Sequence, residues 1–156
     1  MCIKSPIAAA FIASLALLSS MGGTVVAAEN HWRSVAGPVT AEIVRIIDGD
    51  TLEVDAHPWP GHVVRVSVRL RGIDTPERRS SCPEQRAAAQ LARNELERLV
   101  SGFSTVELIN VAGGKYYGRV LADLTAGTRD VASAMLASGL ARPYQGGKRH
   151  HPLCAG

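Results

Sequence analysis

Residues 63–77 read VVRVSVRLRGIDTPE. Up to Leu70, apolar residues alternate with arginine and serine, which is the period of two expected for a strand with one buried face. Gly72 provides a bend, and two carboxylates, Asp74 and Glu77, follow it directly. The stretch predicts a strand over residues 63–73 that ends in an acidic bend.

The segments on either side of this strand predict a small barrel. Residues 41–47, 51–54, 105–111 and 119–124 have the β-branched composition and alternation of strands. Asp48-Gly49-Asp50 predicts a turn between the first two, and residues 55–61, with two prolines and a glycine, predict a loop. Ser81 to Val100 predicts a long helix, because Ser81 and Glu84 have capping-box spacing and Pro83 suits a first turn. Residues 130–138 predict a short second helix.

Five strands with a helix between the third and fourth is the order of an OB-fold barrel. We therefore expect a mainly β fold with helices, built as a five-stranded OB-fold barrel. Such a barrel can bind nucleic acid without performing any reaction, so the expected fold leaves the function open.

The first 28 residues have the pattern of a secretory signal peptide: Lys4, an apolar run over residues 7–18, and small residues up to Ala28. We expect cleavage before Glu29 and export to the periplasm or the medium, with no membrane contact afterwards. An uncleaved N-terminal tether is the alternative. The expected organisation is a signal peptide over 1–28, a linker over 29–40, an OB-fold domain over 41–144, and a basic tail over 145–156.

The charge of the exported part is nearly balanced. Removal of Lys4 leaves 16 of the 17 Lys and Arg residues against 14 Asp and Glu, a net charge of +2. Of the 17 cationic residues in the full chain, 14 are arginine. Arginine binds phosphate with a planar fork, which is compatible with a nucleic-acid partner. A GC-rich coding bias would produce the same composition.

Two cysteines, Cys82 and Cys154, belong to the expected exported part. An even number in an exported protein predicts a disulfide, which would tie the tail to the start of the long helix. In the chain-entropy model, closing a loop of this size stabilises the fold by roughly 4 kcal/mol. Two free thiols are the alternative.

Three short blocks carry the candidate chemistry: Asp48 to Thr51, Arg69 to Glu77, and Lys115 to Arg119. Acids that hold a hard cation, an acid that activates water, and arginines that bind phosphate together suit the cleavage of a phosphodiester. The spacing of Arg69 and Asp74 is odd, which places them on opposite faces of a strand unless Gly72 bends it.

The order and spacing of these blocks closely resemble the staphylococcal nuclease (thermonuclease) family, from about Ala41 to Tyr144. The resemblance implies the same OB-fold. It implies that Asp50, Asp74 and the backbone carbonyl of Thr75 are the metal ligands, completed by water into a shell suited to calcium. Asp48 matches a family position near the metal.

The resemblance also assigns roles to the remaining site residues. Glu77 corresponds to the general base that orients the attacking water, and Arg69 and Arg119 correspond to the pair that stabilises the pentacoordinate phosphorus. Tyr117 and Tyr144 match positions that contact the bound nucleotide, and a half-buried place in the barrel is the alternative for each tyrosine. The chain departs from the family after Tyr144, where residues 145–156 replace further tyrosines and a C-terminal helix.

The sequence therefore predicts an exported, calcium-dependent endonuclease that cuts DNA and RNA, leaves 3′-phosphate ends, and acts as a monomer without a stable protein partner. A non-catalytic nucleic-acid-binding or interaction module on the same barrel is the alternative. The five histidines lack the spacing of a zinc site, and we expect them on the surface.

Overall fold

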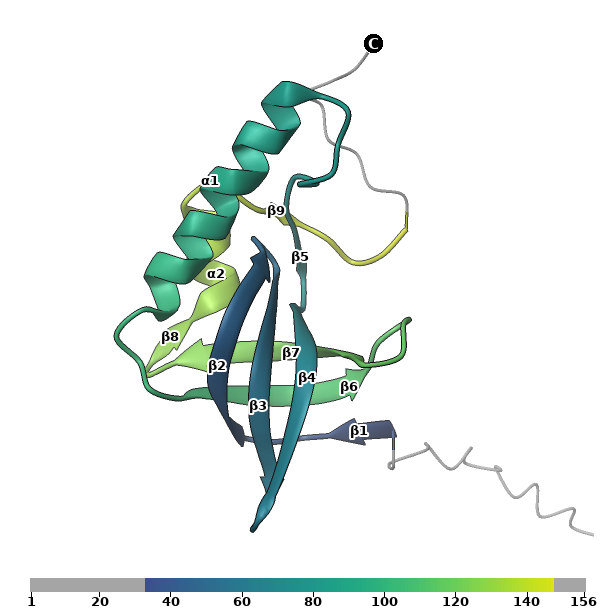
Figure 1. The fold of residues 1–156 in the computed structure, drawn as a ribbon, viewed down its shortest axis with the longest axis vertical. Helices are drawn as coiled ribbons and strands as arrows, with labels where there is room; N and C mark the ends of the chain where they lie inside the picture. Colours follow the sequence, from purple (N-terminus) through teal and green to yellow (C-terminus); the bar gives the residue numbers. More distant parts are fainter. Residues whose placement is uncertain (1–32, 148–156) are drawn as a thin grey trace, which may run out of the picture.

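The computed structural model describes residues 33–147. Most of its strands form one sheet in the order β1-β6-β2-β3-β4-β7-β8, and β6 also pairs with β7. That last pairing closes β2, β3, β4, β7 and β6 into a five-stranded barrel (Figure 1). The prediction of a mainly β, OB-type barrel is therefore confirmed. The barrel strands are β2 (Val39–Asp48), β3 (Thr51–Trp59), β4 (His62–Leu70), β6 (Val106–Gly113) and β7 (Arg119–Ala126).

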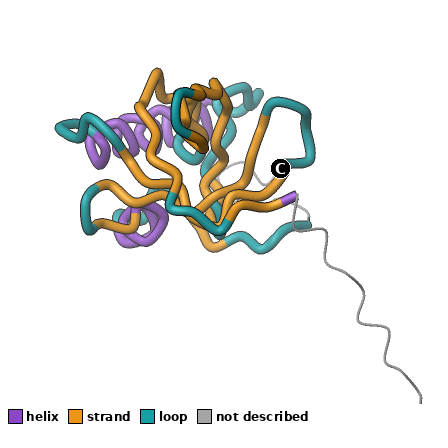
Figure 2. Tube along the Cα trace, turned by 90° about the horizontal axis from the view of Figure 1, so that it is seen from below, coloured by secondary structure: helices purple, strands orange, loops and turns teal. Residues whose placement is uncertain are grey.

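The remaining elements extend or cover the barrel. Two short strands lie at the ends of the large sheet, and two more pair with each other away from it: β1 (Ser34–Val35), β8 (Arg129–Asp130), β5 (Ile73–Asp74) and β9 (Arg142–Pro143). The helices α1 (Pro83–Val100) and α2 (Val131–Ala137) contact each other and lie to the same side of the strands (Figure 2).

The core lies inside the barrel and under α1. Every second residue of the barrel strands points inward, as Leu52 and Val54 on β3 and Val68 and Leu70 on β4 illustrate; all four are at most 1% exposed. Leu96 of α1 is completely buried against this core. Burial of each such leucine or valine contributes about 1.5–3 kcal/mol, so packing, rather than strand propensity, holds the barrel closed.

The hairpin of β3 and β4 is longer than the sequence predicted. Residues 55–59 continue β3 instead of forming a loop, and the pairing runs out to Trp59 opposite His62. The register shifts between Ala56 and Trp59, and this irregularity accommodates Pro58, which cannot donate to a regular ladder. The prolines therefore mark a bulge near the tip of the hairpin rather than the end of the strand.

The predicted strand over residues 63–73 is divided in two. Strand β4 ends at Leu70, and a turn at Arg71 and Gly72 leads into β5. Gly72 has φ +77°, a conformation that residues with a Cβ rarely adopt. Since β5 pairs with β9 and not with the large sheet, the chain changes direction between Arg69 and Asp74.

Two boundaries also differ from expectation. Ser34–Val35 pairs with β6, and β2 begins at Val39, so strands occupy part of the expected linker over 29–40. The capping box of Ser81 and Glu84 does not form, because the helix begins one residue later, with Cys82 as its N-cap. Instead, the Arg86 guanidinium donates to the carbonyls of Ser80 and Ser81. These backbone contacts were not visible in the sequence pattern.

Several predictions fall outside residues 33–147. The expected signal peptide, Cys154 and most of the basic tail are among the residues that the structure does not describe. Cys82 itself is disulfide-bonded, but its pairing with Cys154 stays a prediction. Within the described range, none of the helices combines the length and apolarity that a membrane crossing requires.

The predicted bridge of Cys82 and Cys154 has a direct test. Intact-mass spectrometry of the oxidised exported chain is expected to show two hydrogens fewer than the reduced chain, because one S–S bond replaces two thiols. Reduction is expected to lower the melting temperature, since the bridge restricts the unfolded chain. Complete alkylation of both cysteines without a reductant would refute the bridge.

Candidate active site

The turn between β2 and β3 carries the first candidate acids. Gly49 is buried against α1, where an added Cβ would lie 2.6 Å from the Cβ of Ala92. This close approach fixes the turn and directs Asp50 inward, where it is only 3% exposed. The Asp50 carboxylate accepts hydrogen bonds from Thr51 Oγ1 at 2.8 Å and from the backbone N–H of Thr75 at 3.2 Å. A turn acid thus contacts the segment that follows β5.

Arg69 brings the two distant acidic blocks together. Its Nη1 donates to Asp50 Oδ1 at 2.9 Å and its Nη2 donates to Asp74 Oδ1 at 2.6 Å. The side chains of all three residues are mostly buried, with exposures of 14% for Arg69, 4% for Asp50 and 6% for Asp74. In an unbroken strand, Arg69 and Asp74 would point to opposite faces because they are an odd number of residues apart. The turn at Gly72 redirects the chain, so that the two side chains can meet.

The cluster gathers two carboxylates around one guanidinium in a place where water screens little. Carboxylate oxygens are hard donors, which suit a hard cation such as Ca²⁺. No group of three or more His, Cys, Asp or Glu side chains suited to a metal was found within residues 33–147. The expected ligand set needs only two carboxylates and one carbonyl.

A small polar cavity of about 110 Å³ lies beside this cluster. It brings together residues from the β2–β3 turn, from β4, from the segment after β5 and from the start of β7. Asp74 is bonded to Arg69 but does not itself line the cavity, whereas every other residue predicted for metal binding or catalysis does. The polar cavity is lined by Asp48, Asp50, Thr51, Arg69, Thr75, Pro76, Glu77 and Arg119.

Asp48 supplies a further oxygen at this cavity. Its Oδ1 is buried without a hydrogen-bond partner in the described residues, although Arg78 Nε lies 3.2 Å away in an ion pair. The distance satisfies an ion pair, but the geometry is not that of a hydrogen bond. The Asp48 carboxylate therefore adds a charged oxygen to the cavity wall, next to the Arg78 guanidinium.

Arg119 reaches the cavity because β7 runs parallel to β4. The pairing places Arg119 opposite Ser67 and Leu121 opposite Arg69, so both arginines arise from neighbouring strands. The Arg119 guanidinium carbon lies 5.6 Å from the centre of the Tyr116 ring, within the range of a cation–π contact. The structure therefore identifies Tyr116 as a neighbour of Arg119, which the sequence analysis had missed.

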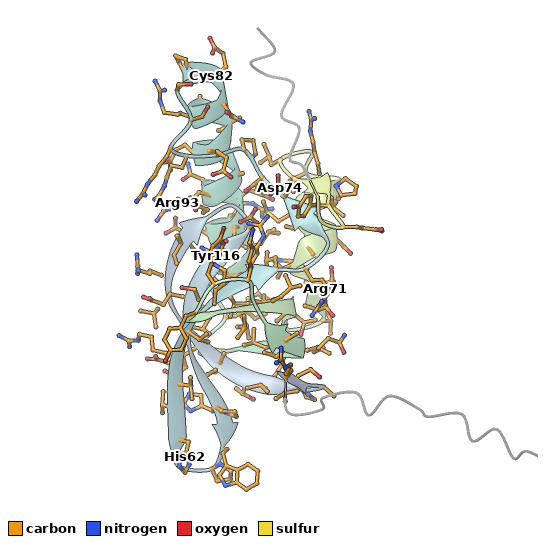
Figure 3. All side chains as sticks on the ribbon, turned by 90° about the vertical axis from the view of Figure 1, so that its right-hand side faces the viewer. His62, Arg71, Asp74, Cys82, Arg93 and Tyr116 are labelled. Carbon is orange, nitrogen blue, oxygen red and sulfur yellow. The ribbon has the colours of Figure 1, made fainter. Side chains whose placement is uncertain are left out.

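The tyrosines divide differently from the prediction. A second cavity, of about 480 Å³, adjoins the polar one and is lined by Arg69, Arg119, Tyr116 and Tyr144. The side chain of Tyr117 is fully exposed and does not line this cavity. Two adjacent tyrosines in a loop have no periodicity to distinguish them, so only the backbone path could show which one turns inward. In Figure 3, Cys82 lies at one end of the molecule and His62 at the other, with Asp74 and Tyr116 between them.

Tyr144 is placed by the small sheet of β5 and β9. Pro143 lies opposite Ile73 in that sheet, and the Tyr144 N–H donates to the Gly72 carbonyl at 2.8 Å. Its hydroxyl donates to the Gly147 carbonyl at 2.9 Å. The strand that carries Asp74 therefore also positions Tyr144.

The described histidines lie away from the site. His62 is near the tip of the β3–β4 hairpin (Figure 3), where its Nδ1 is 3.2 Å from the Pro60 carbonyl. His57 Nε2 is 3.3 Å from a carboxylate oxygen of Glu42. Both are exposed, as predicted. The other three, His31, His150 and His151, fall outside the described residues.

Comparison with known proteins adds two findings. The family described as "Staphylococcal nuclease homologue" matches residues 67–152. The match includes the arginines and the second acidic block but begins after Asp50. Protein ParB of Escherichia coli is 35% identical over 123 residues. That alignment covers 78% of this chain but 64% of the relative, so the chain spans less than two thirds of that protein.

Proposed function

This chain belongs to the staphylococcal nuclease homologue family, and we propose that it is an exported, calcium-dependent endonuclease that hydrolyses phosphodiester bonds of DNA and RNA. Family membership supports a nuclease-type function in general. The observation that carries the more specific proposal is the polar cavity, in which Arg69, Glu77 and Arg119 surround one small space beside the buried carboxylates.

The arginines and Glu77 divide the work of the reaction. A phosphate in the cavity contacts the guanidinium groups of Arg69 and Arg119, which stabilise the charge that develops on its oxygens. Glu77 accepts a proton from a water molecule as that water attacks phosphorus. The new P–O bond forms opposite the bond that breaks, and the displaced sugar oxygen takes up a proton from solvent water and leaves as a hydroxyl.

Asp50, Asp74 and the Thr75 carbonyl would hold the calcium ion, with Asp48 nearby. When bound, the ion neutralises charge on the phosphate and draws the substrate against the arginines. The two buried carboxylates that Arg69 brings together support this assignment. Because all of these residues come from a single chain, we propose that the protein acts as a monomer whose partner is nucleic acid.

A cleavage assay with a matched variant tests the proposal. The exported chain, Glu29 to Gly156, is expected to degrade both DNA and RNA in the presence of calcium. Glu77→Gln, which removes the proton acceptor, is expected to lower the rate by about 10²- to 10⁴-fold. Glu107→Gln serves as the control, because Glu107 is a half-buried acid of β6 that does not line the polar cavity. Binding of nucleic acid without any cleavage would instead favour the non-catalytic module.

A further inference from the structure

A third cavity lies next to the two that form the candidate site. It measures about 480 Å³. We name it the Arg71 pocket, because Arg71 and Gln145 line it but line neither cavity of the candidate site. We name the other cavity of about 480 Å³ the Tyr116 pocket. Each has a volume within the range of about 300–1,000 Å³ that is typical of small-ligand sites.

The two pockets share a common boundary. Arg69, Leu121 and Tyr144 line both of them, and Arg69 also lines the polar cavity. A phosphate held at Arg69 would therefore have a pocket on either side. Since successive bases of a nucleic acid flank each phosphate, this arrangement corresponds to the layout of a dinucleotide.

Tyr144 is held as a partition between the pockets. Its backbone is bonded to Gly72 and its hydroxyl to Gly147, so both ends of the residue are restrained. An aromatic ring presents two faces on which bases can stack, and such stacking is tolerant of sequence because every base has a π-face. A restrained ring between two pockets can therefore contact a base from each.

The Arg71 guanidinium is also held in place. Its Nη2 donates to the carbonyls of Asn110 and Leu121, and its Nε lies 3.2 Å from Asp123 Oδ1. Asp123 is itself fixed by a hydrogen bond of 2.7 Å from Asn110 Nδ2. Because Asp123 balances the charge of Arg71, the side chain acts mainly as a flat, pre-oriented surface. Guanidinium planes are platforms on which nucleic-acid bases stack.

We propose that the Arg71 pocket is a second nucleotide subsite, in which a base stacks between Tyr144 and the Arg71 guanidinium. The neighbouring base occupies the Tyr116 pocket, and the scissile phosphate lies between them at Arg69 and Arg119. This inference rests on the proposed function and deepens it. It makes the preferred substrate an internal phosphodiester with a nucleotide on each side, and it makes Arg71 a substrate-binding residue.

Binding of two matched probes tests the subsite. One is a thymidine mononucleotide carrying a terminal phosphate, and the other is a thymidine dinucleotide whose internal linkage is a non-cleavable methylene phosphonate. Titration calorimetry with calcium present, on protein purified after expression of the full chain, is expected to show about tenfold or tighter binding of the dinucleotide, as one added stacking contact provides. Arg71→Lys, which keeps the charge and removes the plane, is expected to abolish that gain. It is expected to leave the mononucleotide Kd within about twofold.

Two controls separate the subsite from effects on folding or overall charge. Arg65→Lys alters an exposed arginine within strand β4, which pairs with Asp55 at 2.7 Å, and is expected to change neither Kd. Gln145→Glu places a negative charge in the Arg71 pocket without removing any contact of Arg71, and is expected to weaken only the dinucleotide. Gln90→Glu, at an exposed position of α1, is the control for Gln145→Glu.

The possible outcomes have distinct meanings. Equal affinity for the two probes in the wild-type protein would overturn the second subsite while leaving the proposed nuclease function standing. A loss of both affinities in Arg71→Lys, with an unchanged melting temperature, would also overturn it, because Arg71 would then serve the first site. Failure of the wild-type protein to bind either probe would overturn the proposed function and the subsite together.

Discussion

Chelation of divalent metal is expected to stop nucleic-acid cleavage completely, and calcium in the millimolar range to restore it. Asp50 and Asp74 are buried carboxylates that both accept hydrogen bonds from Arg69. The expected ligands are all oxygens, which favour calcium over metals that prefer histidine or cysteine. Full activity in a chelator would show that the site works without metal.

Thermal unfolding gives a readout of the metal that is independent of catalysis. A ligand that binds only the folded protein, at about 100 times its Kd, adds about 2.7 kcal/mol to the free energy of unfolding. Calcium is therefore expected to raise the melting temperature of the wild-type protein and of Asp55→Asn, which alters a half-buried acid of β3 paired with Arg65. Asp50→Asn is expected to lose the rise. An equal rise in Asp50→Asn would place the calcium elsewhere.

Replacement of Arg119 by lysine is expected to lower turnover by roughly 30- to 900-fold. Lysine keeps the charge but loses the planar fork that matches two phosphate oxygens. The figure corresponds to about 2–4 kcal/mol of transition-state stabilisation, the scale of one lost oxyanion donor. Steady-state kinetics with a defined oligonucleotide would measure it. Arg45→Lys, at an exposed arginine paired with Glu53, is the control and is expected to be neutral. Near-normal turnover in Arg119→Lys would contradict the phosphate-binding role.

Arg69→Lys is expected to have a second consequence that Arg119→Lys lacks. Arg69 bonds two buried carboxylates at once, and removal of one partner from a buried ion pair commonly costs about 3–5 kcal/mol. Lysine cannot reproduce two directed hydrogen bonds from one planar group, so Arg69→Lys should reduce stability as well as turnover. Arg119 is therefore the cleaner position for assigning a role in the reaction.

The barrel could be predicted because the sequence signals for its strands and helices lie within short stretches of the chain. Alternation of apolar residues in residues 63–70, a helix-length apolar pattern up to Val100 and turn residues between them specify element types without any long-range contact. The errors occurred where tertiary contacts override local signals. Pro58 suggested a loop, but pairing with β4 carries the strand past it. Ser81 suggested a helix N-cap, but the helix begins after Cys82, and the Ser81 carbonyl accepts a hydrogen bond from the Arg86 guanidinium.

The sequence by itself determined the kinds of residue available for chemistry in the three blocks 48–51, 69–77 and 115–119. Acids lie in the first two blocks, arginines in the last two, and a pair of tyrosines in the last. The tertiary structure alone decided which of them meet. Arg69 and Asp74 come together because Gly72 turns the chain out of β4, and Arg119 joins them because β7 runs parallel to β4. It likewise placed Tyr116, rather than Tyr117, beside Arg119 and set Tyr144 between two pockets. The physical reason is that local sequence sets backbone periodicity, whereas the direction of a side chain in a closed barrel depends on strand pairing between residues far apart in the chain.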